Sequence, residues 1–353
     1  MRRSNSLLEQ LIKANVIEKE ALTDEQTLHS PWYIQILSAF FGWLSSLFLL
    51  GFCALFVLDS IDEPVVIGSL GIVLVAMAYF ILKSAASYFL EHLGLALSLA
   101  GQVAVAYFLL IDEQNWLIFG VFHLVLAVVM PNFIHRVFSV IFAAISFDVG
   151  LLMVGIADVL SSVALMTLVV FSLNEFKYLR FYQQMSAVIY GLVIYWLTIR
   201  CFSSYIVDVL ASLSNNRELL AFPYQISQVL FVIAIMFSVL MLMMSNKSSL
   251  RSPYIIATLV LALAVILLTL QATGISAAII IILLGFSRSN RIMMAMGIIA
   301  LLSYCSVYYY SMEQTLLYKS VIFLGIAVMM LIIRFAMTRF TLTDLRQKIE
   351  AET

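Results

Sequence analysis

The sequence predicts an all-α membrane protein, a polytopic bundle of about twelve transmembrane helices with its N- and C-termini in the cytoplasm. Of 353 residues, 63% are hydrophobic and only 11% are charged, whereas a soluble domain carries about 25% charged residues. Apolar runs of roughly the 18 to 25 residues needed to cross a bilayer recur from Tyr33 to Phe335. Connections that carry basic residues alternate along the chain with connections that carry few or none. These three observations predict the fold class.

The apolar runs give the order of the predicted elements, because each run is bounded by charged or turn-forming residues. The fourth and tenth runs are short, and "VGIAD" alone separates the fifth from the sixth, so ten or eleven spans remain alternatives to twelve. The predicted spans are 33–58, 64–82, 90–111, 115–130, 137–155, 157–173, 182–207, 224–244, 254–271, 273–287, 292–310 and 315–335.

Loop charge predicts how the spans are oriented. With the N-terminus in the cytoplasm, all nineteen basic residues except Arg200, Arg217 and Lys319 fall in cytoplasmic segments. The opposite connections include "DSIDEP", "DEQN", "QATG" and "SMEQ". This alternation follows the positive-inside rule, and one miscounted span would reverse it from that point on. We therefore expect twelve spans.

Two polar segments flank the predicted transmembrane domain, residues 33–335. Residues 1–32 are predicted to be a cytoplasmic amphipathic segment, since Ser6 and Glu9 form a capping box ahead of an apolar helical face. That helix either packs on the membrane domain or binds a partner. Residues 336–353 are predicted to be a cytoplasmic C-terminal tail.

A few polar residues lie inside the predicted spans. An unpaired charge at the centre of a span costs about 2.5 to 3.5 kcal/mol on insertion scales, so these side chains are expected to face the bundle interior. His123 is predicted to be an interhelical hydrogen-bonder, and Arg200 is near enough to the outer interface to reach it. Asp148 and Lys319 are predicted to pair, either as a structural link or as part of a transport path. The candidate intramembrane polar site comprises Gln102, His123, Asp148, Arg200 and Lys319.

Stripes of small residues mark two predicted spans. Along one face of the third span lie Gly94, Ser98, Gly101 and Gln102. The first span repeats the pattern with Ser38, Gly42 and Ser45. Small residues let two helix backbones approach closely, and an amide can hydrogen-bond between helices. Both stripes are predicted to be packing seams, with a substrate path as the alternative.

The short loop "GFSRSNR" is a candidate contact for lipid headgroups through Arg288, Asn290 and Arg291. Arginine and asparagine can donate charge-assisted or ordinary hydrogen bonds to an anionic headgroup. Ordinary positive-inside anchoring explains the same arginines and is the favoured interpretation.

Several function classes find no support in the motifs. The chain has no phosphate-binding loop, zinc-protease helix or nucleophile elbow, so we expect no enzyme activity and no cofactor or metal. Cys53, Cys201 and Cys305 lie in apolar runs without C-x-x-C spacing and are predicted to be buried thiols. The net charge of −1 and the lack of a basic patch predict no nucleic-acid partner.

Four stretches together resemble a bacterial family, domain of unknown function 4401. They are "SPWYIQILSAFFGWLSSLFLLGF", "EHLGLALSLAGQ", "GFSRSNR" and "YYYSMEQTLLYKS". In the family pattern, glycine is usual where this chain has Ser289, and an acidic residue often precedes the lysine where this chain has Tyr318. The resemblance implies a multi-pass protein of the bacterial inner membrane. It also implies a gene neighbourhood that encodes a second multi-pass protein and a small membrane-anchored protein with a Gly-Asp-Tyr signature.

Two functions from different classes follow. The first is a non-enzymatic membrane subunit or scaffold, embedded in the lipid bilayer and bound to other membrane proteins encoded nearby. The alternative is a transporter or flippase-like carrier with a polar cavity in its outer half around Lys319, Asp148 and Arg200. An enzyme acting on lipid-linked substrates ranks third, because no outer-face pair of carboxylates or histidines stands out.

Overall fold

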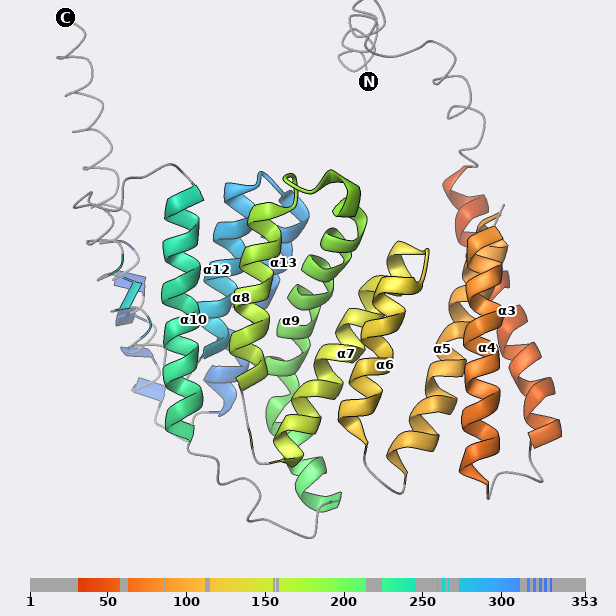
Figure 1. Cartoon of the computed structure of the whole chain (residues 1–353). Helices are drawn as coiled ribbons and strands as arrows, with labels where there is room; N and C mark the ends of the chain where they lie inside the picture. Colours follow the sequence, from red (N-terminus) through yellow and green to blue (C-terminus); the bar gives the residue numbers. More distant parts are fainter. Residues whose placement is uncertain are drawn as a thin grey trace, which may run out of the picture. The chain divides into compact units, whose positions relative to one another are not determined.

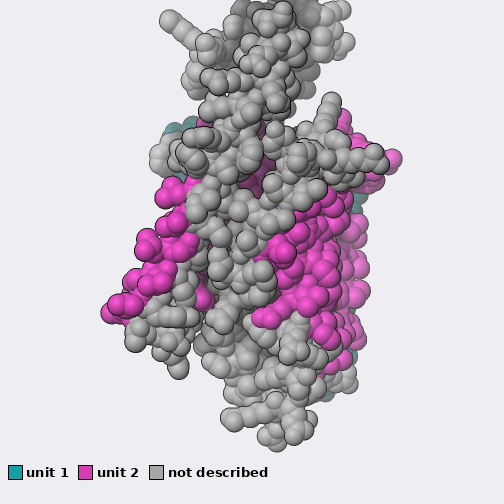
Figure 2. Space-filling model, turned by 90° about the vertical axis from the view of Figure 1, so that its left-hand side faces the viewer, with its two compact units in different colours: residues 1–108 teal, residues 109–353 magenta. Residues whose placement is uncertain are grey.

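The computed structural model describes residues 31–57, 63–84, 87–111, 115–154, 156, 159–213, 224–245 and 273–311, with scattered positions within 259–266 and 316–331. These residues are helical and include no β-strand. The chain divides into two compact units, unit 1 (residues 1–108) and unit 2 (residues 109–353), coloured separately in Figure 2. Most of the predicted N-terminal segment and the whole predicted C-terminal tail lie outside the described residues.

Figure 1 shows the described helices, coloured in the order of the sequence. Unit 1 contains α3 (Trp32–Val57), α4 (Pro64–Ser84) and nearly all of α5 (Tyr88–Leu110). Unit 2 contains α6 (Trp116–Val129), α7 (Phe133–Met153), α8 (Val159–Asn174), the 3-10 turn η2 (Leu179–Phe181), α9 (Tyr182–Leu213), α10 (Tyr224–Ser245), α12 (Thr273–Ser287) and α13 (Arg291–Ser311).

The all-helical prediction is confirmed for the described residues, and each of these ten α-helices coincides with a predicted span. The doubtful boundary at "VGIAD" does separate two helices, since α7 ends at Met153 and α8 begins at Val159. Within the described part, five helices are long and apolar enough to cross a membrane: Pro64–Ser84, Tyr88–Leu110, Phe133–Met153, Ile226–Ser245 and Arg291–Tyr310. The predicted spans 254–271 and 315–335 lie largely outside the described residues. The total of twelve and the side of the termini stay predictions.

Glycines set the helix packing in unit 1. Gly94 and Gly101 of α5 both face α4: a Cβ added at Gly94 would lie 2.9 Å from Leu82, and one at Gly101 would lie 2.6 Å from the carbonyl oxygen of Gly71. Gly42 of α3 is equally close to α5, at 2.8 Å from the carbonyl oxygen of Phe89. Helices at this distance gain van der Waals contact along their backbones. The small-residue stripes are therefore packing seams, as their spacing predicts.

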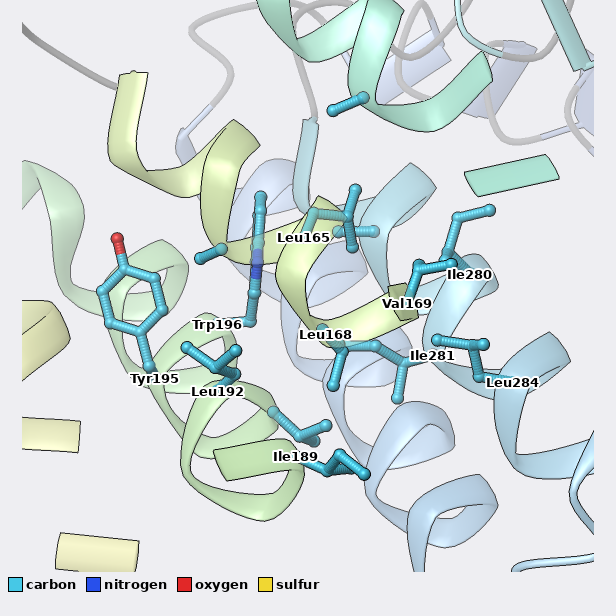
Figure 3. Close-up of a cluster of buried hydrophobic side chains, with 14 of the residues drawn as sticks. Leu165, Leu168, Val169, Ile189, Leu192, Tyr195, Trp196, Ile280, Ile281 and Leu284 are labelled. Carbon is cyan, nitrogen blue, oxygen red and sulfur yellow. The ribbon is translucent and has the colours of Figure 1, made fainter. Parts of the chain in front are cut away.

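Unit 2 is built around a core of interlocking apolar side chains (Figure 3). Trp196 of α9 is fully buried, and Leu165 and Leu168 of α8 and Ile281 of α12 lie in the same cluster. The Tyr304 hydroxyl of α13 donates a hydrogen bond to the backbone carbonyl of Trp196. Helices that are distant in sequence are thus held together by dense apolar packing with a hydrogen bond at its edge.

The free thiols Cys201 and Cys305 pack against a second, smaller core cluster of unit 2 that includes Ile275 and Tyr304. Both are half-buried among apolar neighbours. As predicted, these two cysteines pack as small hydrophobic side chains, but they are half-buried rather than buried. The side chain of Cys53 lies outside the described part.

Candidate functional site

Three connections of unit 2 meet at one end of its helices: 130–132, 175–181 and 288–290 (Figure 1). The side-chain amide of Asn290 donates a hydrogen bond to the Tyr190 hydroxyl over 3.0 Å. The rings of Tyr190 and Phe133 lie 6.3 Å apart between centroids, and the Arg288 guanidinium lies 5.7 Å from the centre of the Phe176 ring. We call this cluster the basic end, after its cations Arg136, Lys177, Arg180, Arg288 and Arg291.

The turn between α6 and α7 is closed by its own side chains. Arg136 is buried, and its Nε donates a hydrogen bond to the carbonyl oxygen of Met130 over 2.6 Å. The side chain of Asn132 accepts a hydrogen bond from the backbone N–H of His135 over 3.0 Å and so caps α7. The side-chain hydrogen bonds of Arg136 and Asn132 therefore fix this turn.

The "GFSRSNR" loop turns sharply from α12 into α13. Ser289 has a φ of 54°, in the left-handed region that favours glycine. The backbone N–H of Asn290 donates to the carbonyl oxygen of Gly285 over 2.8 Å. The side-chain oxygen of Asn290 accepts from the N–H of Met293 over 3.0 Å. Asn290 thus caps α13, so its side chain is already engaged within the protein. Of the predicted headgroup contact, Arg288 and Arg291 are the charged groups.

The two arginines of this loop lie in different environments. Arg291 is exposed, at the first position of α13. Arg288 is half-buried, and its Nε and Nη2 are shielded from solvent with no hydrogen-bond partner among the described residues. Its charge is therefore not neutralised by a direct hydrogen bond through these two atoms.

Glu175 supplies a buried carboxyl group beside these cations. It is 8% exposed, and burial raises its pKa above the ordinary value, while a side-chain hydrogen bond from Ser186 and the positive charge of Arg288 act in the opposite direction. The Ser186 hydroxyl belongs to α9, so its bond to Glu175 closes the connection between α8 and α9. Burial therefore destabilises the ionised carboxylate more than the hydrogen bond and the nearby positive charge stabilise it.

The intramembrane polar residues that the structure describes are enclosed by helix packing. Gln102 in unit 1 is 3% exposed, and its side-chain amide donates to the Ser98 hydroxyl one turn earlier over 3.2 Å. His123 in unit 2 is 1% exposed. The His123 ring lies edge-on to Phe119, at 4.4 Å between centroids, and 5.3 Å from the ring of Phe142.

Aromatic packing takes the place of the hydrogen bond predicted for His123. Neither ring nitrogen of His123 has a hydrogen-bond partner in the part of the chain that the structure describes. Asp148 lies half-buried on α7. The side chain of Arg200, on α9, and the whole of Lys319 lie outside the described residues, so the predicted pair of Asp148 and Lys319 stays a prediction. The described residues contain no group of three or more His, Cys, Asp or Glu placed to hold a metal.

Sequence reasoning missed three members of the basic end: Glu175, Ser186 and Tyr190. Tyr190 and its partner Asn290 are 100 residues apart, whereas Glu175 and Ser186 bond to each other across a single connection. A signal for one of them exists in "NEFKYLRFY", where an acid directly precedes a run of alternating aromatic and basic residues at the end of a span. Such runs are typical of a membrane–water interface.

No curated protein and no solved structure matches the chain. The model of a family described as a domain of unknown function, DUF4401, matches residues 31–340. Apart from Ser30, this range includes the four stretches that carry the resemblance, and it includes every helix described above. The chain is a member of the DUF4401 family.

Proposed function

We propose that this protein is a non-enzymatic subunit of the bacterial inner membrane that holds other membrane proteins in a complex. The supporting observation is that Gln102 and His123 are enclosed in packed helices, with exposed fractions of 3% and 1%. A carrier needs polar side chains that its substrate or water can reach. Gln102 instead bonds to its own helix, and phenyl rings surround His123.

Rigid packing also suits a scaffold. The glycine seams place α4 and α5 in backbone contact, and a Cβ at Gly71 would lie 2.6 Å from the carbonyl oxygen of Gly101. Seams this tight resist sliding, because packed interfaces do not deform continuously. The outward faces, meanwhile, are apolar: Phe48 of α3 is 72% exposed and Leu302 of α13 is 65% exposed. Such faces fit lipid or the transmembrane helices of a partner.

Photo-crosslinking in the native membrane tests the scaffold. A photoreactive phenylalanine analogue replaces Phe48 or Leu302 in a chromosomally expressed copy. Matched controls replace Ser46 and Ala300, which lie on the same two helices and are 1% and 0% exposed. We expect a discrete adduct with another membrane protein from at least one exposed position and none from the buried controls. If exposed positions give lipid adducts alone, and purified protein in liposomes moves a solute, the carrier replaces the scaffold.

We also propose twelve spans with both termini in the cytoplasm. The connections 175–181 and 288–290, which carry basic residues, lie at one end of unit 2 together with the connection 130–132 that precedes Arg136, and this arrangement supports the loop-charge alternation. In a variant without native cysteines, single cysteines at Glu63 and Asn115 should react with an impermeant reagent added to spheroplasts, and one at Ser289 should react only after lysis. Labelling at Ser289 in intact spheroplasts would reverse the proposed orientation.

A further inference from the structure

The connection between α8 and α9 presents an unusual surface, Phe176–Tyr182, which we call the α8–α9 surface. All seven of its residues are exposed. Five carry large apolar or aromatic side chains, and Leu179 at its centre is 74% exposed. Aromatic and aliphatic side chains that stay exposed to water do not gain the favourable free energy that burial would give them. Their concentration in one short connection therefore calls for a surface that covers them.

Cations are interleaved with these rings. The Lys177 ammonium lies 5.6 Å from the centre of the Tyr178 ring, and the Arg180 guanidinium lies 5.8 Å from that of Phe181. Arg288 of the next connection lies over Phe176 at 5.7 Å. At these distances the cations are attracted to the ring faces. Three positive charges are thus held beside exposed apolar side chains.

The α8–α9 surface is fixed by contacts at both of its ends. The Phe176 and Tyr182 rings stack, with centroids 6.2 Å apart and planes 24° apart. Just before this pair, Glu175 is bonded to the Ser186 hydroxyl of α9. A surface that is ordered before binding loses less conformational entropy when a ligand arrives.

We propose that the α8–α9 surface binds the headgroup region of an anionic phospholipid. The surface joins the ends of two apolar helices, where the headgroup layer of a bilayer lies. Aromatic side chains prefer that layer, and lysine and arginine prefer anionic headgroups within it. A free phosphate ion would satisfy the cations but would leave Leu179 and the aromatic rings in water, so lipid accounts for both halves of the surface.

Thermal unfolding in a neutral detergent, with short-chain lipid added, tests the proposal. Dioctanoyl phosphatidylglycerol should raise the unfolding temperature of the wild-type protein more than dioctanoyl phosphatidylcholine does. The double variant Lys177→Gln/Arg180→Gln changes two exposed side chains, and its response to lipid is measured from its own unfolding temperature without lipid. It should need roughly thirtyfold more phosphatidylglycerol for the same shift, because each basic residue near an anionic surface is worth about fivefold in affinity.

Lys83→Gln is the matched control. Lys83 is also exposed and lies 5.7 Å over a tyrosine ring, that of Tyr79, but it belongs to unit 1. This variant should respond to phosphatidylglycerol as the wild type does. Three results would overturn the proposal: equal stabilisation by the two lipids, an unchanged response of the double variant, or an equal loss in Lys83→Gln. Stabilisation by inorganic phosphate as strong as that by phosphatidylglycerol would replace the lipid with a phosphate-ion site.

Discussion

Gly71 of α4 and Gly101 of α5 face each other so closely that a Cβ on either residue would lie 2.6 Å from the carbonyl oxygen of the other. Real Cβ atoms essentially never approach a backbone oxygen this closely. The two helices must therefore move apart to accept any side chain here. Adding one methyl group at either glycine therefore tests how tightly α4 and α5 pack in unit 1.

Gly101→Ala should destabilise the protein by about 1 to 3 kcal/mol, the usual cost of overpacking. Gly51→Ala on α3 is the control, because no heavy atom lies within 4 Å of the added Cβ there. That change should be neutral or stabilising, since alanine favours helix over glycine by about 1 kcal/mol. Unfolding followed in detergent by circular dichroism checks both. Equal unfolding temperatures for the two variants would show that α4 can move away from α5 at Gly71 without a loss of stability.

Ser289→Gly should stabilise the protein by about 1 kcal/mol. A left-handed backbone costs a residue with a Cβ roughly 1 to 2 kcal/mol relative to glycine, and Ser289 has a φ of 54°. Ser287→Gly provides a contrast of opposite sign two residues earlier, because Ser287 is still within α12 and glycine weakens a helix. Denaturant titration of the two variants should move the midpoint in opposite directions. A shift of the same sign in both variants would show that the left-handed backbone of Ser289 does not decide the effect on stability.

How much the sequence predicts depends on how local the cause is. The seam at Gly94 and Gly101 follows from helical periodicity alone, which is why spacing predicts it. The capping role of Asn290 is local too, but its bond to Tyr190 joins residues 100 positions apart. Periodicity carries no information about such tertiary partners. For the same reason it does not predict the aromatic environment of His123, which includes Phe142 of the neighbouring helix.

Glu175→Gln should remove a pH dependence of stability. Burial raises the pKa of Glu175 in the folded protein, so the native state holds this proton more tightly than the unfolded state does. Its contribution to stability is therefore greatest at low pH and declines as pH rises from the ordinary glutamate pKa through the raised one. The unfolding temperature of the wild type, relative to that of Glu175→Gln, should fall across that interval.

Arg288→Gln extends the same test. The charge of Arg288 holds the Glu175 pKa down, so its removal should raise that pKa further and carry the decline to higher pH. Arg291→Gln, an exposed arginine in the same region, should leave the decline in place. A wild-type curve parallel to that of Glu175→Gln at every pH would exclude Glu175 as the titrating group.

His123→Leu should leave stability unchanged or increase it. The His123 ring is enclosed by Phe119, Phe122 and Phe142, and its nitrogens have no hydrogen-bond partner in the described part of the chain. An apolar side chain of similar volume avoids the cost of burying them, about 1 to 3 kcal/mol. The unfolding temperature and complementation of a deletion strain check the variant together. A stable variant that fails to complement would assign His123 a role in moving protons or substrate.

Asp148 lies half-buried on α7, and Lys319 lies outside the described residues. In the predicted span 315–335, Lys319 follows Glu313 by six positions, which would place it about 9 Å further along a helix at 1.5 Å per residue, where a lone ammonium would be costly. If Asp148 pairs with it structurally, Lys319→Met and Asp148→Asn should each reduce the yield of folded protein. The double variant should recover much of that loss, because it leaves no charge unpaired.

Complementation of a deletion strain separates structure from transport at this pair. A structural pair predicts that the double variant both folds and complements. A pair that moves protons or substrate predicts that the double variant folds but does not complement, since the charges themselves are then required. A single Lys319→Met variant that is stable and functional would contradict both versions. The ammonium of Lys319 would then reach the outer interface along its own flexible side chain, and Asp148 would need no cation from that helix.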